Sequence, residues 1–79
     1  MFALKVFTPD KELYAGPATF LAAKAVDGEI GILANHAPLI ALLAPGPLRY
    51  HLPDGKEVSI KGSDGFLKVE DNKVFVLLA

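Results

Sequence analysis

A carboxylate and an imidazole lie close together in the segment DGEIGILANHAPLIALLAPG, which spans residues 27–46. Glu29 and His36 have the chemistry of a general acid–base pair, but such groups must lie within hydrogen-bond reach of the reacting atoms, usually in a pocket. Thr19 is the only hydroxyl near the segment that could serve as a nucleophile, and the chain has no cysteine. We therefore predict that the chain is not an enzyme.

Histidines and acids also suggest a metal site, with His36, His51, Asp27 and Glu29 as the candidate ligands. A structural zinc site needs four closely spaced ligands, and His51 is predicted to lie on the solvent-facing side of a strand. For His36 two interpretations stay open: a loop imidazole that bonds backbone groups and caps the turn, or a contact with a partner. We expect no metal and no other cofactor. A metal-assisted hydrolase built on Glu29 and His36 is the weakest functional hypothesis.

Two glycines near the start of the segment, Gly28 and Gly31, raise the question of a phosphate-binding loop. The spacing G-x-x-x-x-G-K-[ST] is absent, and no long helix is predicted to follow. We expect instead that both glycines supply a positive φ or allow a close approach of two backbone segments. Together with Pro38, they are predicted to shape a loop and not a reactive site.

Length and composition point to a small interaction domain. The chain has 79 residues, which predicts one domain over residues 1–79. A domain of this size hides only about 60% of its unfolded surface, yet 52% of its residues are hydrophobic, so an exposed apolar patch and a protein partner are expected. The net charge of −1, with no run of either sign, predicts no nucleic-acid partner. No stretch approaches the roughly 20 apolar residues of a membrane span, so direct insertion into lipid is not expected.

Alternating apolar and polar residues predict strands along most of the chain. Phe2, Leu4 and Val6 form one face of the first strand, and turn residues such as Pro53-Asp54-Gly55 separate later ones. The expected strands cover residues 2–7, 12–15, 18–26, 39–44, 48–52, 57–61, 66–69 and 74–78. Strands that recur about every ten residues predict an all-β fold, a flattened β-sandwich or barrel of roughly 8–10 short strands.

Two of these strands are apolar throughout, which leaves their surroundings open. Residues 39–44 read LIALLA and are either buried on both faces or packed against the core on one face and a partner on the other. Either arrangement allows Pro38 only at the start or the edge of the strand. The last strand, 74–78, is either central and covered twice or in contact with another chain.

The order of short motifs resembles the N-terminal domain of the epsilon subunit of F-type ATP synthases, which is called delta in mitochondria. The family pattern is roughly G-E-x-G-I-L-P-G-H-A-P-L, followed by a short apolar strand and P-G. The chain carries, in the same order as the family, TP at 8–9, LY at 13–14, GEIGIL at 28–33, HAPL at 36–39, PG at 45–46, GFLKV at 65–69, NKV at 72–74 and VL at 76–77. The resemblance spans essentially the whole chain.

The resemblance implies a non-catalytic subunit of the central rotor stalk, which docks the gamma subunit onto the ring of c subunits and couples proton or sodium flow to ATP synthesis. Glu29 matches a position that meets the c ring, and Thr8, His36 and Ala41 match positions near gamma. The alpha/beta catalytic head is implied as an indirect partner. The implied location is peripheral to the energy-transducing membrane, on its cytoplasmic side in a bacterium and on the matrix or stroma side in an organelle.

Three departures from the family pattern qualify these expectations. Ala34-Asn35 replaces Pro-Gly before the histidine, and Asn also tolerates the left-handed conformation. Ser63-Asp64-Gly65 replaces a tighter Ser-Gly-Gly. The family usually continues into a C-terminal helical hairpin that inhibits ATP hydrolysis, and these residues have no counterpart of it, so no inhibitory role is expected of them. A free-standing β-sandwich that binds a small molecule or carbohydrate is the alternative, and it would need exposed aromatic platforms.

Overall fold

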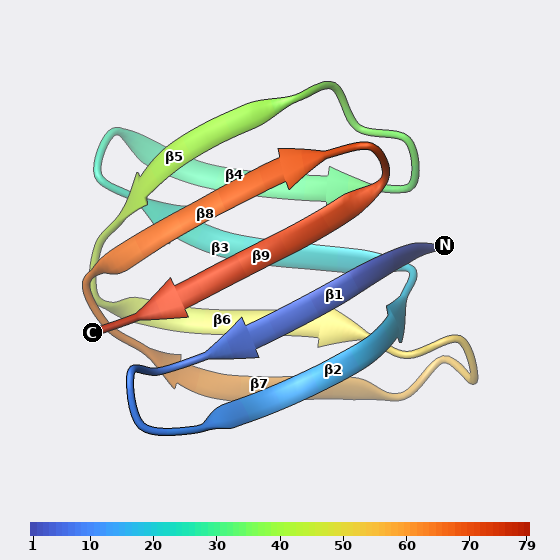
Figure 1. Ribbon diagram of the computed structural model, residues 1–79, viewed down its shortest axis with the longest axis horizontal. Helices are drawn as coiled ribbons and strands as arrows, with labels where there is room; N and C mark the ends of the chain where they lie inside the picture. The colour runs from blue at the N-terminus through green and yellow to red at the C-terminus, as the bar shows by residue number, and fades with distance from the viewer.

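Nine β-strands and no helix make up the protein, as the computed structural model of residues 1–79 shows (Figure 1). The predicted all-β fold is confirmed. Without a helix, no segment meets the length and apolarity that a membrane-crossing helix requires. The strands are β1 (Phe2–Phe7), β2 (Glu12–Ala18), β3 (Phe20–Ala25), β4 (Gly28–Leu33), β5 (Leu39–Leu43), β6 (Gly46–His51), β7 (Glu57–Gly62), β8 (Gly65–Glu70) and β9 (Lys73–Leu78).

All nine strands belong to one sheet that curls on itself into two layers. The hydrogen-bonded order is β2-β1-β9-β8-β5-β3-β6-β7, and β4 pairs with β3 off this path. Strands β2, β1, β9, β8 and β5 form the front layer in the view of Figure 1, and β4, β3, β6 and β7 form the back layer. A single residue pair, Ala25 with Leu43, joins the two layers. The layers can therefore face each other as a sandwich while remaining one sheet.

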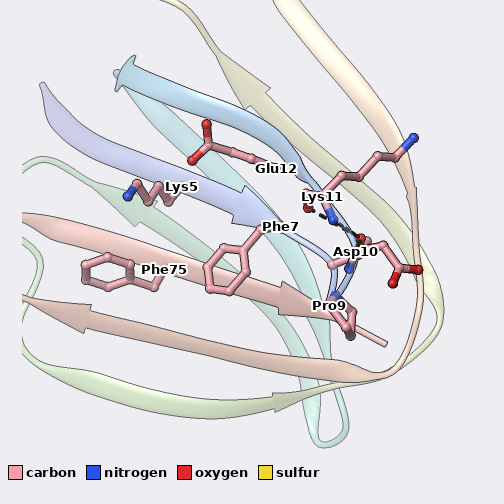
Figure 2. A pocket seen from close by; sticks show the side chains of 8 residues that line it. Lys5, Phe7, Pro9, Asp10, Lys11, Glu12 and Phe75 are labelled. Carbon is pink, nitrogen blue, oxygen red and sulfur yellow. Dashed lines mark hydrogen bonds between the residues drawn. The ribbon is translucent and has the colours of Figure 1, made fainter.

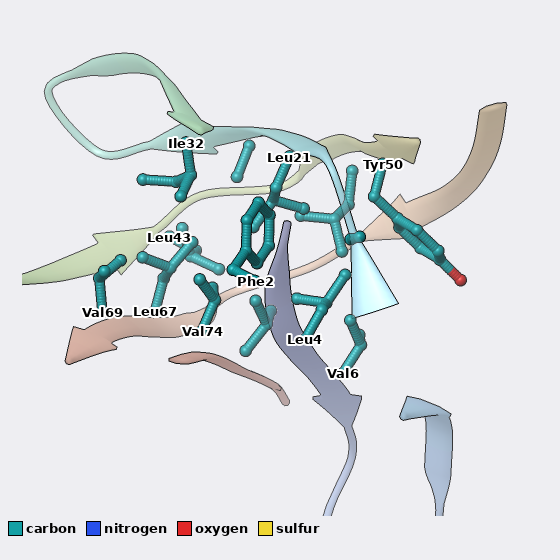
Figure 3. Close-up of a cluster of buried hydrophobic side chains, with 14 of the residues drawn as sticks. Phe2, Leu4, Val6, Leu21, Ile32, Leu43, Tyr50, Leu67, Val69 and Val74 are labelled. Carbon is teal, nitrogen blue, oxygen red and sulfur yellow. The ribbon is translucent and has the colours of Figure 1, made fainter. Parts of the chain in front are cut away.

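Side chains that alternate along the strands fill the space between the layers (Figure 3). The predicted inward face of β1 is confirmed, because Phe2, Leu4 and Val6 are all buried. Leu21 from the back layer and Leu67 from the front layer are fully buried in the same cluster of 15 residues. No charged or polar side chain is buried, so apolar burial alone supplies the driving force for packing the layers.

The stretch 28–33, expected to be a loop, is instead a strand. β4 pairs with β3 along its whole length, with Gly31 opposite Ala22. The prediction failed because only Ile30 and Ile32 face the core, whereas the other positions hold a charged residue, two glycines and the exposed Leu33. Gly31 therefore lies within a strand and does not shape a loop. Its φ is not positive, and an added Cβ would meet the Phe20 ring at an ordinary 3.5 Å.

The two entirely apolar strands each bury only one face. In β5, Leu43 is buried, but Ile40 is 72% exposed and Leu42 is 64% exposed. The expectation that this strand is buried on both faces is therefore wrong for the chain on its own. In β9, alternate residues are buried and the residues between them, Phe75 and Leu77, are half-buried on the outside. β9 is central, between β1 and β8, but it is covered on one side only.

Candidate functional site

The carboxylate and the imidazole of the segment 27–46 lie at opposite ends of the sandwich. Glu29 is near the start of β4, beside the β3–β4 turn, and His36 follows the end of the same strand (Figure 1). The rise of about 3.3 Å per strand residue places Leu33 roughly 13 Å from Glu29 before the chain reaches His36. No hydrogen bond or ion pair joins the two side chains, and no three His, Cys, Asp or Glu side chains cluster as metal ligands would. The two groups cannot act together on one substrate.

His36 is held in a tight turn by backbone groups. Its amide donates to the Leu33 carbonyl at 3.3 Å, and its Nδ1–H donates to the Ala37 carbonyl at 2.7 Å. Asn35 adopts a left-handed φ of 62°, so asparagine takes the conformation for which glycine is usual. Pro38 is exposed and directly precedes β5, a position that costs the sheet no hydrogen bond.

Asn72, in the β8–β9 turn, ties the His36 turn to the rest of the front layer. Its Oδ1 accepts from the Asn35 amide at 2.7 Å, and its Nδ2 donates to the Met1 carbonyl at 2.8 Å. Its own carbonyl accepts from the Ala3 amide at 3.2 Å. Sequence reasoning missed this residue, because its partners lie far away along the chain. Asn72 therefore joins three segments at one end of the sandwich.

Thr8 organises the turn between β1 and β2 at the other end of the sandwich. Its Oγ1 accepts from the amides of Asp10 and Lys11 at 3.3 and 3.2 Å and donates to the Lys11 carbonyl at 3.3 Å. The turn borders an open hollow of about 410 Å³. Figure 2 shows the rings of Phe7 and Phe75 side by side beyond this turn, on the outer surface of β1 and β9.

The outer face of the front layer carries a continuous line of apolar side chains. Cross-strand pairing places Leu42 opposite Phe66, Phe66 opposite Leu77, and Leu77 opposite Phe7. This apolar row crosses β5, β8, β9 and β1, and none of its members is buried. Ala41, the residue matched to a gamma position, is half-buried on the inward side of β5, between Leu39 and Leu43. A contiguous exposed apolar surface of this kind is typical of a protein-docking site.

The outer face of the back layer is polar by comparison. His51 Nε2–H donates to Glu57 at 2.8 Å, and Arg49 lies 4.0 Å from the same carboxylate. Glu29 is exposed opposite Lys24, also exposed, without forming an ion pair. The rings of Phe20 and His51 are in contact, with centroids 5.1 Å apart. Half-exposed ion pairs like these contribute little to stability. One large apolar side chain on this face, Leu33 opposite Phe20, is 62% exposed.

The two tyrosines offer no platform for a carbohydrate. Tyr50 is buried and stacks at 4.8 Å on Tyr14, whose hydroxyl donates to the Pro17 carbonyl at 2.6 Å. Burial, followed by the nearby Tyr14, raises the pKa of Tyr50 above its usual range. On the outer face, the hydrogen bond from Lys68 and then its charge lower the pKa of Glu70. The shift of Tyr50 therefore reflects the core, and that of Glu70 reflects an exposed ion pair on the outer face.

These features define a small β-sandwich with one uncovered apolar face. A family model described as ATP synthase, delta/epsilon chain, beta-sandwich domain matches residues 1–79. The chain therefore belongs to this family, and the resemblance seen in the motifs is confirmed. The all-strand architecture agrees with the family description.

Relatives and solved structures agree with the family. The chain is 47% identical over 73 residues to an ATP synthase epsilon chain of Psychrobacter sp. (strain PRwf-1), covering 92% of this chain and 53% of that protein. It superposes with a TM-score of 0.89 and 28% identity on a chain of the Euglena gracilis mitochondrial ATP synthase, in a structure of OSCP, F1 and c-ring, covering 95% of this chain and 48% of that one. A chain in the central stalk/c-ring structure of the Tetrahymena thermophila mitochondrial ATP synthase shares the fold, with a TM-score of 0.80 at 20% identity, covering 96% of this chain and 61% of that one. The chain spans about half the length of the curated relatives it matches.

Proposed function

We propose that this chain is the β-sandwich part of a central-stalk rotor subunit of an F-type ATP synthase. In this role it docks the gamma subunit onto the c ring, without catalysing a reaction itself, and helps to couple ion flow to ATP synthesis. The observation that carries the proposal is the uncovered apolar row on a chain of this family. The alpha/beta catalytic head is an indirect partner. The complex would lie at the energy-transducing membrane, on the cytoplasmic side in a bacterium and on the matrix or stroma side in an organelle.

The gamma subunit is assigned to the outer face of the front layer. Two residues matched to gamma positions, Thr8 and His36, lie in turns at opposite ends of the sandwich, next to this layer. Between them, Ile40 and Leu42 are the most exposed side chains of the strand that contains Ala41. Covering such side chains contributes roughly 25 cal/mol per Å² of buried apolar area before the costs of association. The contact proposed at Ala41 is therefore carried by its two neighbours.

The c ring is assigned to the end of the sandwich that bears Glu29. Gly28, at the turn before β4, has a φ of 138°, in the region where glycine is favoured, and the Glu29 side chain that follows it is exposed. An exposed carboxylate would set the register against basic or amide groups of the ring, and this contact would weaken with salt.

A rigid body between ring and stalk can transmit torque without slipping. The core supports this role, because closely packed interiors deform little under load. Both turns assigned to gamma are tied down by hydrogen bonds, from Thr8 at one end and from Asn72 at the other. The proposal assigns no inhibitory or nucleotide-sensing role to residues 1–79.

Size-exclusion chromatography with the cognate gamma subunit tests this proposal. The chain should co-elute with gamma at about one to one, and Leu42→Asp should abolish the complex by placing a charge in a desolvated contact. Ser59→Asp is the matched control, since Ser59 is exposed on the outer face of the back layer. If the wild type binds gamma and Leu42→Asp binds it equally well, gamma must bind a surface other than the apolar row. No complex with the wild type would refute the proposal.

A further inference from the structure

A trough lies on the outer face of the front layer, next to the apolar row. It has a volume of about 260 Å³, and its lining is mostly apolar. Ala3, Ala15 and Gly16 line it where β1 and β2 pair, and Phe75 of β9 lines it as well. Small side chains on neighbouring strands leave the space that larger residues would fill. Phe75 and Lys5 also line the hollow beside the β1–β2 turn, which Phe7 of the apolar row and the carboxylates of Asp10 and Glu12 line as well.

Two lysines line the trough, and no carboxylate does. Lys5 lies opposite Phe75 on β9, and Lys73 lies opposite Ala3 on β1. Neither ammonium group forms an ion pair. Lys73 also pairs across the hairpin with Glu70, but that carboxylate is already bonded to Lys68 at 2.9 Å. The trough therefore presents an apolar surface beside two lysines that form no ion pair, although the charge of Lys73 also acts on Glu70.

We infer that this trough receives a segment of the gamma subunit that carries an apolar side chain next to at least one carboxylate. The inference rests on the proposed function and adds the chemistry of the partner at one place on the docking face. The apolar side chain occupies the space above Ala3 and Ala15, and the carboxylate lies between Lys5 and Lys73. The apolar row supplies contact area, whereas the trough fixes the register, because opposite charges orient an interface more than they tighten it.

The affinity for purified cognate gamma, measured by titration calorimetry at several salt concentrations, tests the inference. Lys5→Glu/Lys73→Glu should weaken binding roughly tenfold at low salt and remove most of its salt dependence. Ala15→Phe should weaken binding by a similar factor, because the new ring fills the trough while suiting a strand. Circular dichroism and thermal unfolding verify that each variant is folded. If the charge-reversed variant Lys5→Glu/Lys73→Glu does not fold, Lys5→Gln/Lys73→Gln takes its place.

Lys24→Glu/Lys61→Glu is the matched control, since it makes the same change of net charge on the exposed outer face of the back layer. Unchanged affinity in the control, together with weakening in both trough variants, supports the inference. An equal loss in the control would show a general charge effect and overturn it. Unchanged affinity in both trough variants would also overturn the inference. If Leu42→Asp still abolishes binding in that case, the proposed function stands and only the assignment of the trough fails.

Discussion

The two outer faces of the sandwich are built on the same alternation and yet differ in character. On the front layer, the outward positions of four adjacent strands hold the apolar row from Leu42 to Phe7. On the back layer, the outward positions hold mainly ion-pairing and charged groups such as Arg49, Glu57 and Lys61, with the exposed Leu33 at the end of β4. Both faces cover one core, so core packing does not explain the difference. Apolar residues that the core does not need point to a contact with another molecule.

Substitutions at two neighbouring leucines, Leu42 on the front face and Leu43 in the core, should differ most in their effect on stability. Leu43→Ala should lower the free energy of unfolding by about 2–5 kcal/mol, because Leu43 is only 4% exposed and its loss leaves a cavity. Leu42→Ala, one residue away, should change it by no more than about 0.5 kcal/mol. Urea unfolding measures both. Comparable losses at the two positions would mean that Leu42 belongs to the core and that the front face is not free for docking.

The Asn72 contacts make one edge of the front layer depend on a single side chain. Asn72→Gly keeps the left-handed backbone, with φ at 59°, but removes the bonds to Asn35 and Met1. We expect a loss of roughly 1–2 kcal/mol in unfolding free energy and faster amide exchange at Asn35. Asp71→Gly is the control, since Asp71 has a φ of 51° and its side chain makes no hydrogen bond. Slow exchange at Asn35 in the Asn72 variant would show that other contacts hold the turn.

Glu29→Lys examines the end of the sandwich assigned to the c ring. Glu29 is exposed and forms no ion pair, so the fold should be unchanged by circular dichroism. Binding to the isolated c ring should weaken roughly tenfold, as for loss of a charged contact at an interface. Lys24 lies directly opposite Glu29 on β3, so c-ring binding by Lys24→Glu is measured for comparison with that of Glu29→Lys. Unfolding of the Glu29 variant would assign this residue to stability instead.

At alkaline pH, the pH dependence of stability should reflect a tyrosine of the core. The pKa of Tyr50 is raised in the fold, so the unfolded chain ionises first as the pH rises past about 10. The stability tied to this group is complete below that pH and is lost as the pH rises toward the folded pKa. Tyr50→Phe should flatten the alkaline decline in urea-derived stability. An equally steep decline in this variant would assign it to other groups.

Most of the fold could be predicted because alternation reports which side chains face inward. Phe2, Leu4 and Val6 illustrate this, since a period of two is visible without any knowledge of neighbouring strands. β4 does not show a clear alternation, because its outward positions hold Glu29, Gly31 and the apolar Leu33, and only two isoleucines face inward. Its pairing with β3 supplies the backbone hydrogen bonds that local propensity did not suggest.

The candidate site was less predictable, because it depends on which strands are neighbours. The apolar run 39–44 showed two apolar faces, but only the strand order reveals that nothing covers Ile40 and Leu42. Asn72 bonds Asn35, 37 residues earlier in the chain, and no local pattern indicates such a bond. The left-handed backbone at Asn35 was anticipated, since asparagine tolerates it.

Side-chain footprinting of the chain with and without gamma compares the two faces in one experiment. Hydroxyl-radical labelling reports the exposure of reactive side chains, and each face carries suitable probes: Phe66 and Phe75 in front, His51 behind. Binding of gamma should sharply reduce labelling at Phe66 and Phe75 and leave His51 unchanged. Protection of His51 with unaltered labelling at Phe66 would contradict the assignment of the apolar face to gamma.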